Sequence, residues 1–241
     1  MAIAVTSRGY QYLASGSSGN ITFSAFQPAQ NSLLLITVEA YDGIPNDIIS
    51  SVSCDASWSV STWTQLFRVP LGYGSDPVQE VWGAIVTGAS PASAAVTVVQ
   101  SGYHGKLESE IYEVTGVNVS GGTASSCIGV SVTDTFTDAD AAAKSMTLSS
   151  FASASNGTFL NVFALYNANN ITFEAGWTGG TERGSAAFGR LRSGWIDSED
   201  TSVTFTTTQW YASAIAFEIK AGGGAASIVP QAMANYRMRA A

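Results

Sequence analysis

The sequence predicts an all-β protein: a jelly-roll-like antiparallel β-sandwich of about 12–14 strands, with an extended N-terminal arm and a C-terminal tail. Three observations carry this prediction. Short apolar or alternating segments, separated by Gly, Pro, Asn and Ser, recur about every 10–15 residues. No part of the body keeps the apolar period of an amphipathic helix. Only 12% of the residues are charged while 46% are hydrophobic, which favours buried strands.

The composition excludes several classes of protein. A chain with this hydrophobic content and a mean hydropathy of +0.16 is not disordered, and it has too few Glu, Lys and Arg residues for a coiled coil. The net charge is −8 and the pI is near 4.5, so we expect neither nucleic acid nor an anionic membrane as a partner. We also expect no secretory signal and no membrane span, because the basic start and the long apolar run that these require are missing.

The first half of the chain begins with a polar, Gly/Ser-rich segment, residues 1–20, which we interpret as an extended arm or a weak first strand. Ser32–Tyr41 is almost continuously apolar, as expected of a central strand that is buried on both faces. Loops rich in Gly and Pro separate the other strand candidates. The strands expected in this half are Ile21–Phe26, Ser32–Tyr41, Val52–Cys54, Trp63–Val69, Val78–Val86, Ala95–Gln100 and Leu107–Val114.

The second half repeats this style. Residues 134–144 are acidic and then Ala-rich, and we interpret them as a loop or a single helical turn. The strands expected in this half are Cys127–Val132, Met146–Phe151, Phe159–Tyr166, Ile171–Trp177, Ala186–Leu191, Val203–Thr208 and Ala212–Ala221.

A weak internal echo leaves two domain organisations open. Asn31–Tyr41 resembles Asn156–Tyr166, and Ser109–Gly116 resembles Ala214–Ala221. Either residues 21–221 form one sandwich with interleaved halves, or two tandem sandwiches meet near residues 118–126. We favour the single sandwich, because the segment between the halves is short.

Residues 222–241 differ in kind from the body. They contain Arg237 and Arg239 and no acidic residue, so the net charge of −8 leaves −10 for residues 1–221. The segment opens with a flexible Gly-rich hinge and continues with apolar and basic residues. Docking on a neighbouring subunit is one interpretation and a frayed end is the other. The candidate subunit contacts are Ile228, Val229, Tyr236, Arg237 and Arg239.

No residue pattern indicates catalysis, a metal site or a cofactor. The single histidine, His104, sits in a turn-like Gly-Tyr-His-Gly context without a nucleophile motif. Cys54 and Cys127 are too few for a zinc site or a disulfide framework, and we expect two thiols.

The acidic residues also have ordinary explanations. Asp134, Asp138 and Asp140 lack the glycine and the closing glutamate of a calcium loop. On the strand near residue 110, alternation places Glu108 and Glu110 on one face and Glu113 on the other. We expect a solvated strand face there rather than the carboxylate pair of a glycosidase.

The tryptophans offer the best candidates for ligand binding. Trp58, Trp177 and Trp195 lie beside Gly or Ser in expected loops, where exposed indole rings stack on sugar rings. A place in the core or in a subunit interface is the competing interpretation for each, and for Trp82 we expect the core.

Short motifs carry a resemblance to a known group of proteins. They are a Ser-Val-x-Cys to Trp-Thr turn in residues 51–64, Val-Trp-Gly-Ala in residues 81–84, Val-Thr-Val in residues 96–98 and Ile-Tyr-Glu-Val-Thr-Gly in residues 111–116. Over residues 20–221 the chain resembles β-sandwich structural proteins of tailed-phage and prophage virions, of the decoration or fibre type.

The resemblance implies a non-enzymatic capsid decoration or accessory protein without a cofactor. Such a protein is assembled into the virion in the host cytoplasm and is a homo-oligomer that contacts the major capsid protein or tail proteins. A carbohydrate-binding or host-attachment module, with host glycans as ligands, is the alternative, and a glycan-cleaving enzyme is a more distant one.

Overall fold

The computed structural model describes residues 2–14, 19–41, 48–54, 58–71, 77–88, 93–101, 106–137, 143–165, 171–185, 189–207 and 211–223. Nearly all of these residues belong to antiparallel strands or their connections, and the described part holds one short 3₁₀ helix, η1. The predicted all-β sandwich class is therefore confirmed.

The strands fall into two halves on either side of η1. The first half comprises β1 (Ala4–Leu13), β2 (Ile21–Thr22), β3 (Leu33–Tyr41), β4 (Ile49–Cys54), β5 (Thr64–Pro70), β6 (Val78–Ile85), β7 (Val96–Gln100) and β8 (Lys106–Thr115). After η1 (Ala124–Cys127), the second half comprises β9 (Ile128–Phe136), β10 (Ala143–Thr147), β11 (Gly157–Leu165), β12 (Thr172–Phe173), β13 (Thr178–Gly179), β14 (Arg183–Ser185), β15 (Gly189–Ile196), β16 (Ser202–Thr206) and β17 (Ala212–Ile219).

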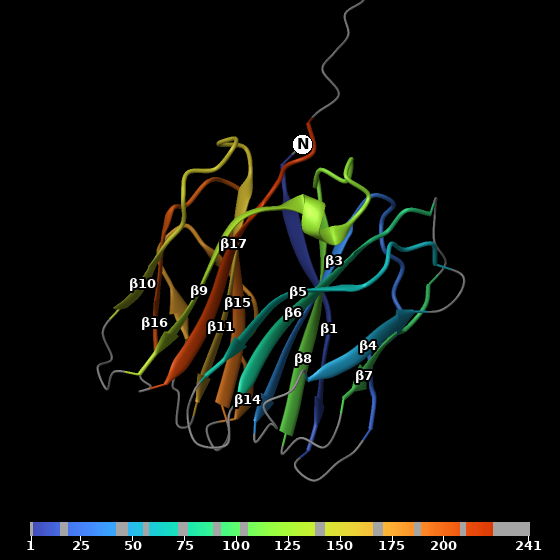
Figure 1. The fold of residues 1–241 in the computed structure, drawn as a ribbon, viewed down its shortest axis with the longest axis horizontal. Helices are drawn as coiled ribbons and strands as arrows, with labels where there is room; N and C mark the ends of the chain where they lie inside the picture. Colours follow the sequence, from blue (N-terminus) through green and yellow to red (C-terminus); the bar gives the residue numbers. More distant parts are fainter. Residues whose placement is uncertain are drawn as a thin grey trace, which may run out of the picture.

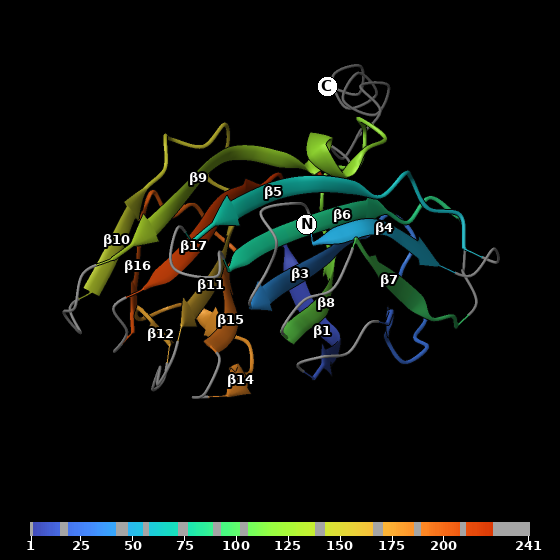
Figure 2. The same ribbon diagram turned by 60° about the horizontal axis from the view of Figure 1, so that its bottom comes forward.

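The strands form four sheets that pack as successive layers (Figures 1 and 2). Two large sheets, with strand orders β1-β8-β3-β6-β5 and β13-β15-β11-β17-β9, lie in the middle, and β14 also pairs with β15. A small sheet covers the outer face of each, β2-β7-β4 on the first and β10-β16-β12 on the second. Each half has its own apolar core between its large and small sheets, and a third core joins the two large sheets.

The strand order of the first half recurs in the second. Replacing β1, β8, β3 and β6 by β9, β17, β11 and β15 converts one large sheet into the other, and β2-β7-β4 likewise becomes β10-β16-β12. The two sequence echoes fall on equivalent strands, β3 with β11 and β8 with β17. The Asn-led alignment is out of register by one residue, because it pairs Leu34, which faces a small sheet, with Phe159, which faces the other large sheet.

The structure departs from the expected elements at several boundaries. Half of the segment expected as an N-terminal arm or a weak first strand forms β1, an edge strand that pairs with β8 from Ala4 to Leu13 with a register shift between Ser7 and Gly9. The expected strand at 171–177 shrinks to β12, and β15 continues five residues beyond its expected end to Ile196. The first residues of the expected acidic loop belong to β9, which ends at Phe136.

Candidate functional site

Ionisable side chains gather between the two large sheets, away from the apolar core that the sheets share. Successive residues of a strand point to opposite faces, so β3 and β8 direct alternate side chains toward the second half. We call this set the inter-sheet ionic cluster; its members are Tyr10, Glu39, Lys106, Glu108, Glu110, Glu182, Arg183 and Arg190. The cluster brings β1, β3 and β8 of the first half together with β14 and β15 of the second.

Glu110 is a carboxylate of the cluster with partners in both halves. It is fully buried, accepts a hydrogen bond from Ser7 Oγ at 2.6 Å, and pairs with Arg183 Nη2 at 3.3 Å. The Arg183 guanidinium also lies 4.9 Å from the ring centroid of Tyr10. Arg183 of β14 therefore contacts both β1 and β8 and links the second half to the first.

Glu39 and Glu108 face each other directly across the β3–β8 ladder, and both are buried. Like charges at opposed positions repel, so such a pair needs neutralisation. Lys106 contacts Glu108 Oε1. Burial raises the pKa of Glu39 well above its ordinary 4.5, and Lys106 opposes this rise. Burial therefore favours the protonated form of Glu39.

The same burial acts on the other titratable groups of the cluster. It lowers the pKa of Lys106, against the opposing effect of Glu39. It also raises the pKa of Tyr10 to about 12, and the negative charge of Glu39 adds to that rise. Desolvation thus favours the neutral forms of all three groups, which suits a role in packing two sheets together.

The expected solvated strand face at Glu108, Glu110 and Glu113 is wrong, because all three residues are at most 1% exposed. The prediction failed because the partners of Glu110 and Glu113 come from distant parts of the chain. Glu113 does point to the other face, as expected, where it accepts hydrogen bonds from Arg8 Nε at 2.7 Å and from the Ala29 amide at 2.6 Å.

Glu218 repeats the role of Glu113 in the second half. It is 1% exposed and accepts hydrogen bonds from the Val130 amide at 2.9 Å, the Ala152 amide at 3.3 Å and the Asn156 side chain. Ala29 and Ala152 both lie in the segment that leads into the central strand of their half, β3 or β11. Each carboxylate therefore fixes the entry of a central strand.

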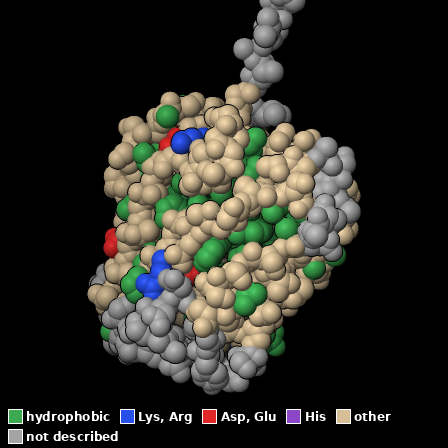
Figure 3. Space-filling model, turned by 45° about the vertical axis from the view of Figure 1, so that its right-hand side comes forward, with side chains coloured by type: hydrophobic (Ala, Val, Ile, Leu, Met, Phe, Trp, Pro, Cys, Tyr) green, Lys and Arg blue, Asp and Glu red, His purple; other side chains and the backbone are tan. Residues whose placement is uncertain are grey.

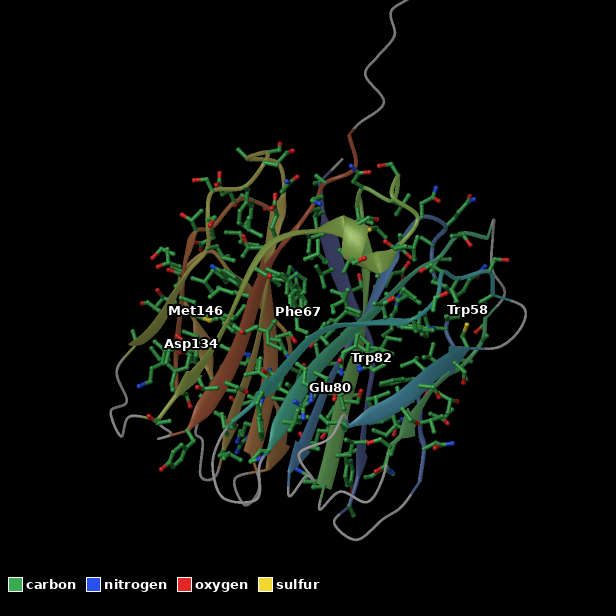
Figure 4. All side chains as sticks on the ribbon, in the orientation of Figure 1. Trp58, Phe67, Glu80, Trp82, Asp134 and Met146 are labelled. Carbon is green, nitrogen blue, oxygen red and sulfur yellow. The ribbon has the colours of Figure 1, made fainter. Side chains whose placement is uncertain are left out.

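The three tryptophans chosen as stacking candidates lie in three different clusters and form no common surface. Trp58 is only 5% exposed and meets Phe26 edge to face at 5.1 Å, so its ring belongs to the core (Figure 4). Trp177 is half-buried and stacks on Phe173 at 6.1 Å. Trp195 is half-buried between the large sheets, 6.0 Å from Tyr112.

A face that the sequence analysis missed lies on β5 and β6. Trp82, which we expected in the core, is half-buried like Trp63, and both adjoin the first-half core at its margin. Trp82 Nε1 donates to Glu80 Oε2 at 2.8 Å (Figure 4). A three-stranded sheet cannot cover a five-stranded one, so side chains near the β5 edge stay partly open. Hydrophobic side chains gather in the middle of the surface shown in Figure 3.

Several other sequence candidates have no described position. His104, Asp138 and Asp140 lie outside the described residues, as do all five candidate subunit contacts, Ile228, Val229, Tyr236, Arg237 and Arg239. Cys54 is half-buried and Cys127 buried, and no disulfide joins them. Asp134 accepts a hydrogen bond from the amide of Thr135 at 2.8 Å.

Two findings concern only the part of the chain that the structure describes. It contains no group of three or more His, Cys, Asp or Glu side chains placed to hold a metal ion. It also contains no helix with the length and apolarity to cross a membrane.

Comparison of the sequence with models of known protein families and with curated proteins finds no match.

Proposed function

We propose that this chain is a non-enzymatic structural protein of a phage virion, most specifically a capsid decoration or accessory protein that acts through contacts between subunits. In this role it assembles in the host cytoplasm, forms homo-oligomers and binds the major capsid protein or tail proteins. The virion assignment rests on the sequence resemblance, and the structural role rests on how the interior uses its charged groups.

The observation that carries the structural role is the internal use of the buried carboxylates. Glu110 and Glu113 are bound by arginines from other strands, and Glu218 by backbone amides and an asparagine. A catalytic carboxylate must reach a substrate, whereas these hold strand entries and sheets in place. A body built this way gains stiffness rather than reactivity.

The sheet edges supply a second argument. Natural β-proteins protect an exposed edge with charged residues, above all lysine. The chain has only Lys106, Lys144 and Lys220; Lys144 is buried and the other two are half-buried. Lysines therefore do not guard the long edge strands β1 and β5, and pairing with neighbouring subunits in a shell would cover them.

Mass spectrometry of purified particles from cells that encode this chain tests the proposal. Hundreds of copies per particle are expected for a shell protein, and a handful for a tail or vertex component. Absence of the chain from the particles, together with a monodisperse monomer that does not bind empty capsids, would overturn it.

A carbohydrate-binding or host-attachment role is the second candidate, favoured by the half-buried rings of Trp63, Trp82 and Trp177. Indole rings with one open face stack on sugars. Glycan-array binding that is lost in Trp82→Ala and Trp177→Ala would support this role. Silence on the array, with all tryptophans shielded from a soluble quencher, would remove it.

A further inference from the structure

We infer that the chain is an internal pseudo-dimer: two sandwiches, residues 2–117 and 128–221, that recognise each other through equivalent surfaces related by an approximate twofold rotation. The partner that fits the inner face of each half is therefore a second sandwich of the same topology but opposite charge.

The edge contacts show the twofold relation. In an isologous interface, if element i touches j, then the equivalent of j touches the equivalent of i. Strand β5 of the first half contacts β9 and β17 of the second. The equivalent contact lies at the opposite edge of the interface. There β1, which corresponds to β9, meets β14 through Tyr10 and Arg183, and β14 is one of the two strands that correspond to β5.

Individual residues follow the same exchange. Glu113 and Glu218 occupy equivalent positions, so residue pairs can be matched by counting from them across the strand ladders of each large sheet. Tyr112 then corresponds to Phe217, and Phe67 corresponds to Gly180. Phe67, labelled in Figure 4, stacks on Phe217 with 5.0 Å between the ring centroids. At the related position, a Cβ placed on Gly180 would lie 3.3 Å from the Tyr112 hydroxyl, so Tyr112 occupies the space next to Gly180.

Charge makes the two faces complementary rather than identical. The first half contributes Glu39, Lys106, Glu108 and Glu110 to the inter-sheet ionic cluster, and the second half contributes Glu182, Arg183 and Arg190. Acidic groups therefore outnumber basic ones on the face of the first half, and basic groups outnumber acidic ones on the face of the second. Two first halves would set carboxyl groups against carboxyl groups, and two second halves would set guanidinium groups against each other. The geometry thus allows like halves to pair, while the charges select unlike halves.

The junction can be opened without touching the interface. Gly121 and Gly122 lie in an exposed turn, and a side chain at Gly122 would meet nothing within 4 Å. A site-specific protease sequence inserted between these glycines in the full chain allows cleavage after folding. The cleaved chain should elute from a sizing column as the intact one does. The halves are then separated in urea, refolded apart and mixed.

Each separated half should show the circular dichroism of a folded β-protein, and mixing should give a 1:1 complex by native mass spectrometry. Glu110→Gln in the first half should weaken the complex about tenfold or more. Glu113→Gln is the matched control, because it changes a carboxyl on the same strand that faces away from the interface, and it should leave the dissociation constant within about twofold.

Three results would overturn the inference. Halves that stay unfolded until mixed would mean a single folding unit. Folded halves that fail to associate would mean that their faces do not recognise each other. Homodimers tighter than the mixed complex would refute the selection by charge.

Discussion

Gly184, at the middle of β14, is a position where the packing of β14 against Glu108 of the first half and against its neighbour β15 can be measured by adding one methyl group. Its φ is +94°, a conformation that costs an L-residue about 1–2 kcal/mol. A Cβ there would lie 2.7 Å from Oε2 of the buried Glu108 and would also clash with the carbonyl oxygen of Gly189, the strand partner of Ser185. A close clash of this kind in a packed interior costs about 1–3 kcal/mol more. We therefore expect Gly184→Ala to lower the free energy of unfolding by about 2–5 kcal/mol.

Gly176→Ala is the matched control. Its φ of +95° carries the same backbone cost, but the nearest atom to its added Cβ is Ile196 Cδ1, at an ordinary 3.8 Å. Urea unfolding followed by tryptophan fluorescence gives both free energies. The difference between the variants isolates the clash with Glu108 and Gly189. If Gly184→Ala is within about 0.5 kcal/mol of Gly176→Ala, the close packing of β14 against Glu108 and Gly189 is refuted.

Three further predictions concern the interior. Because burial raises the pKa of Glu39, the folded protein loses stability as the pH rises above 4.5 toward that higher pKa. Glu39→Gln should therefore be more stable than the wild type by about 1 kcal/mol or more at pH 8 and no more stable at pH 4. Equal shifts of the urea midpoint at both pH values would contradict this. Burial also raises the pKa of Cys127 to about 11. At pH 8 the Cys127 thiol should therefore react with maleimide at least about a hundredfold more slowly in the folded protein than in the unfolded protein. Peptide mapping measures both rates, and equal rates would contradict the burial of this thiol. Phe217→Ala should lower the free energy of unfolding by about 3–5 kcal/mol, because the fully buried Phe217 ring stacks on two other rings. Tyr12→Ala, at a residue that is 59% exposed, should change the free energy of unfolding by less than about 0.5 kcal/mol. Similar losses in both variants would refute the assigned burial.

Apolar pattern was enough to predict the central strands. Ser32–Tyr41 and Phe159–Tyr166 are mostly apolar, and they correspond to β3 and β11, each paired on both sides. The edges were harder to predict. β1 alternates weakly because one of its faces and its outer edge stay partly open, so the sequence of Ala4–Leu13 fits an extended arm as well as the weak first strand that it forms. In β15, Gly189, Gly194 and two arginines obscured a strand that packing between sheets holds together.

The candidate site could be predicted only in part, because its partners are far apart in sequence. Alternation correctly separated the face of Glu110 from that of Glu113. Nothing local indicates that Arg183, 73 residues away, reaches Glu110, or that Arg8, 105 residues before Glu113, reaches that carboxylate. Without those partners, a charged strand is most economically interpreted as solvent-facing. The repeated Glu in the two sequence echoes was the available signal that these carboxylates have a structural role.

Three separate segments of the chain meet at one end of the molecule. Ala2 packs against Gly116, the Gly222 amide donates to the Gly116 carbonyl at 2.7 Å, and Val117 pairs with Ala221. The first described residues, the passage between halves and the last described residues therefore share a single end of the molecule (Figure 1). A cargo fused directly at residue 2 or at residue 223 would leave the body from this same end. A circularly permuted chain, opened at Gly121 and closed by a short bridge from residue 223 to residue 2, should keep the same architecture.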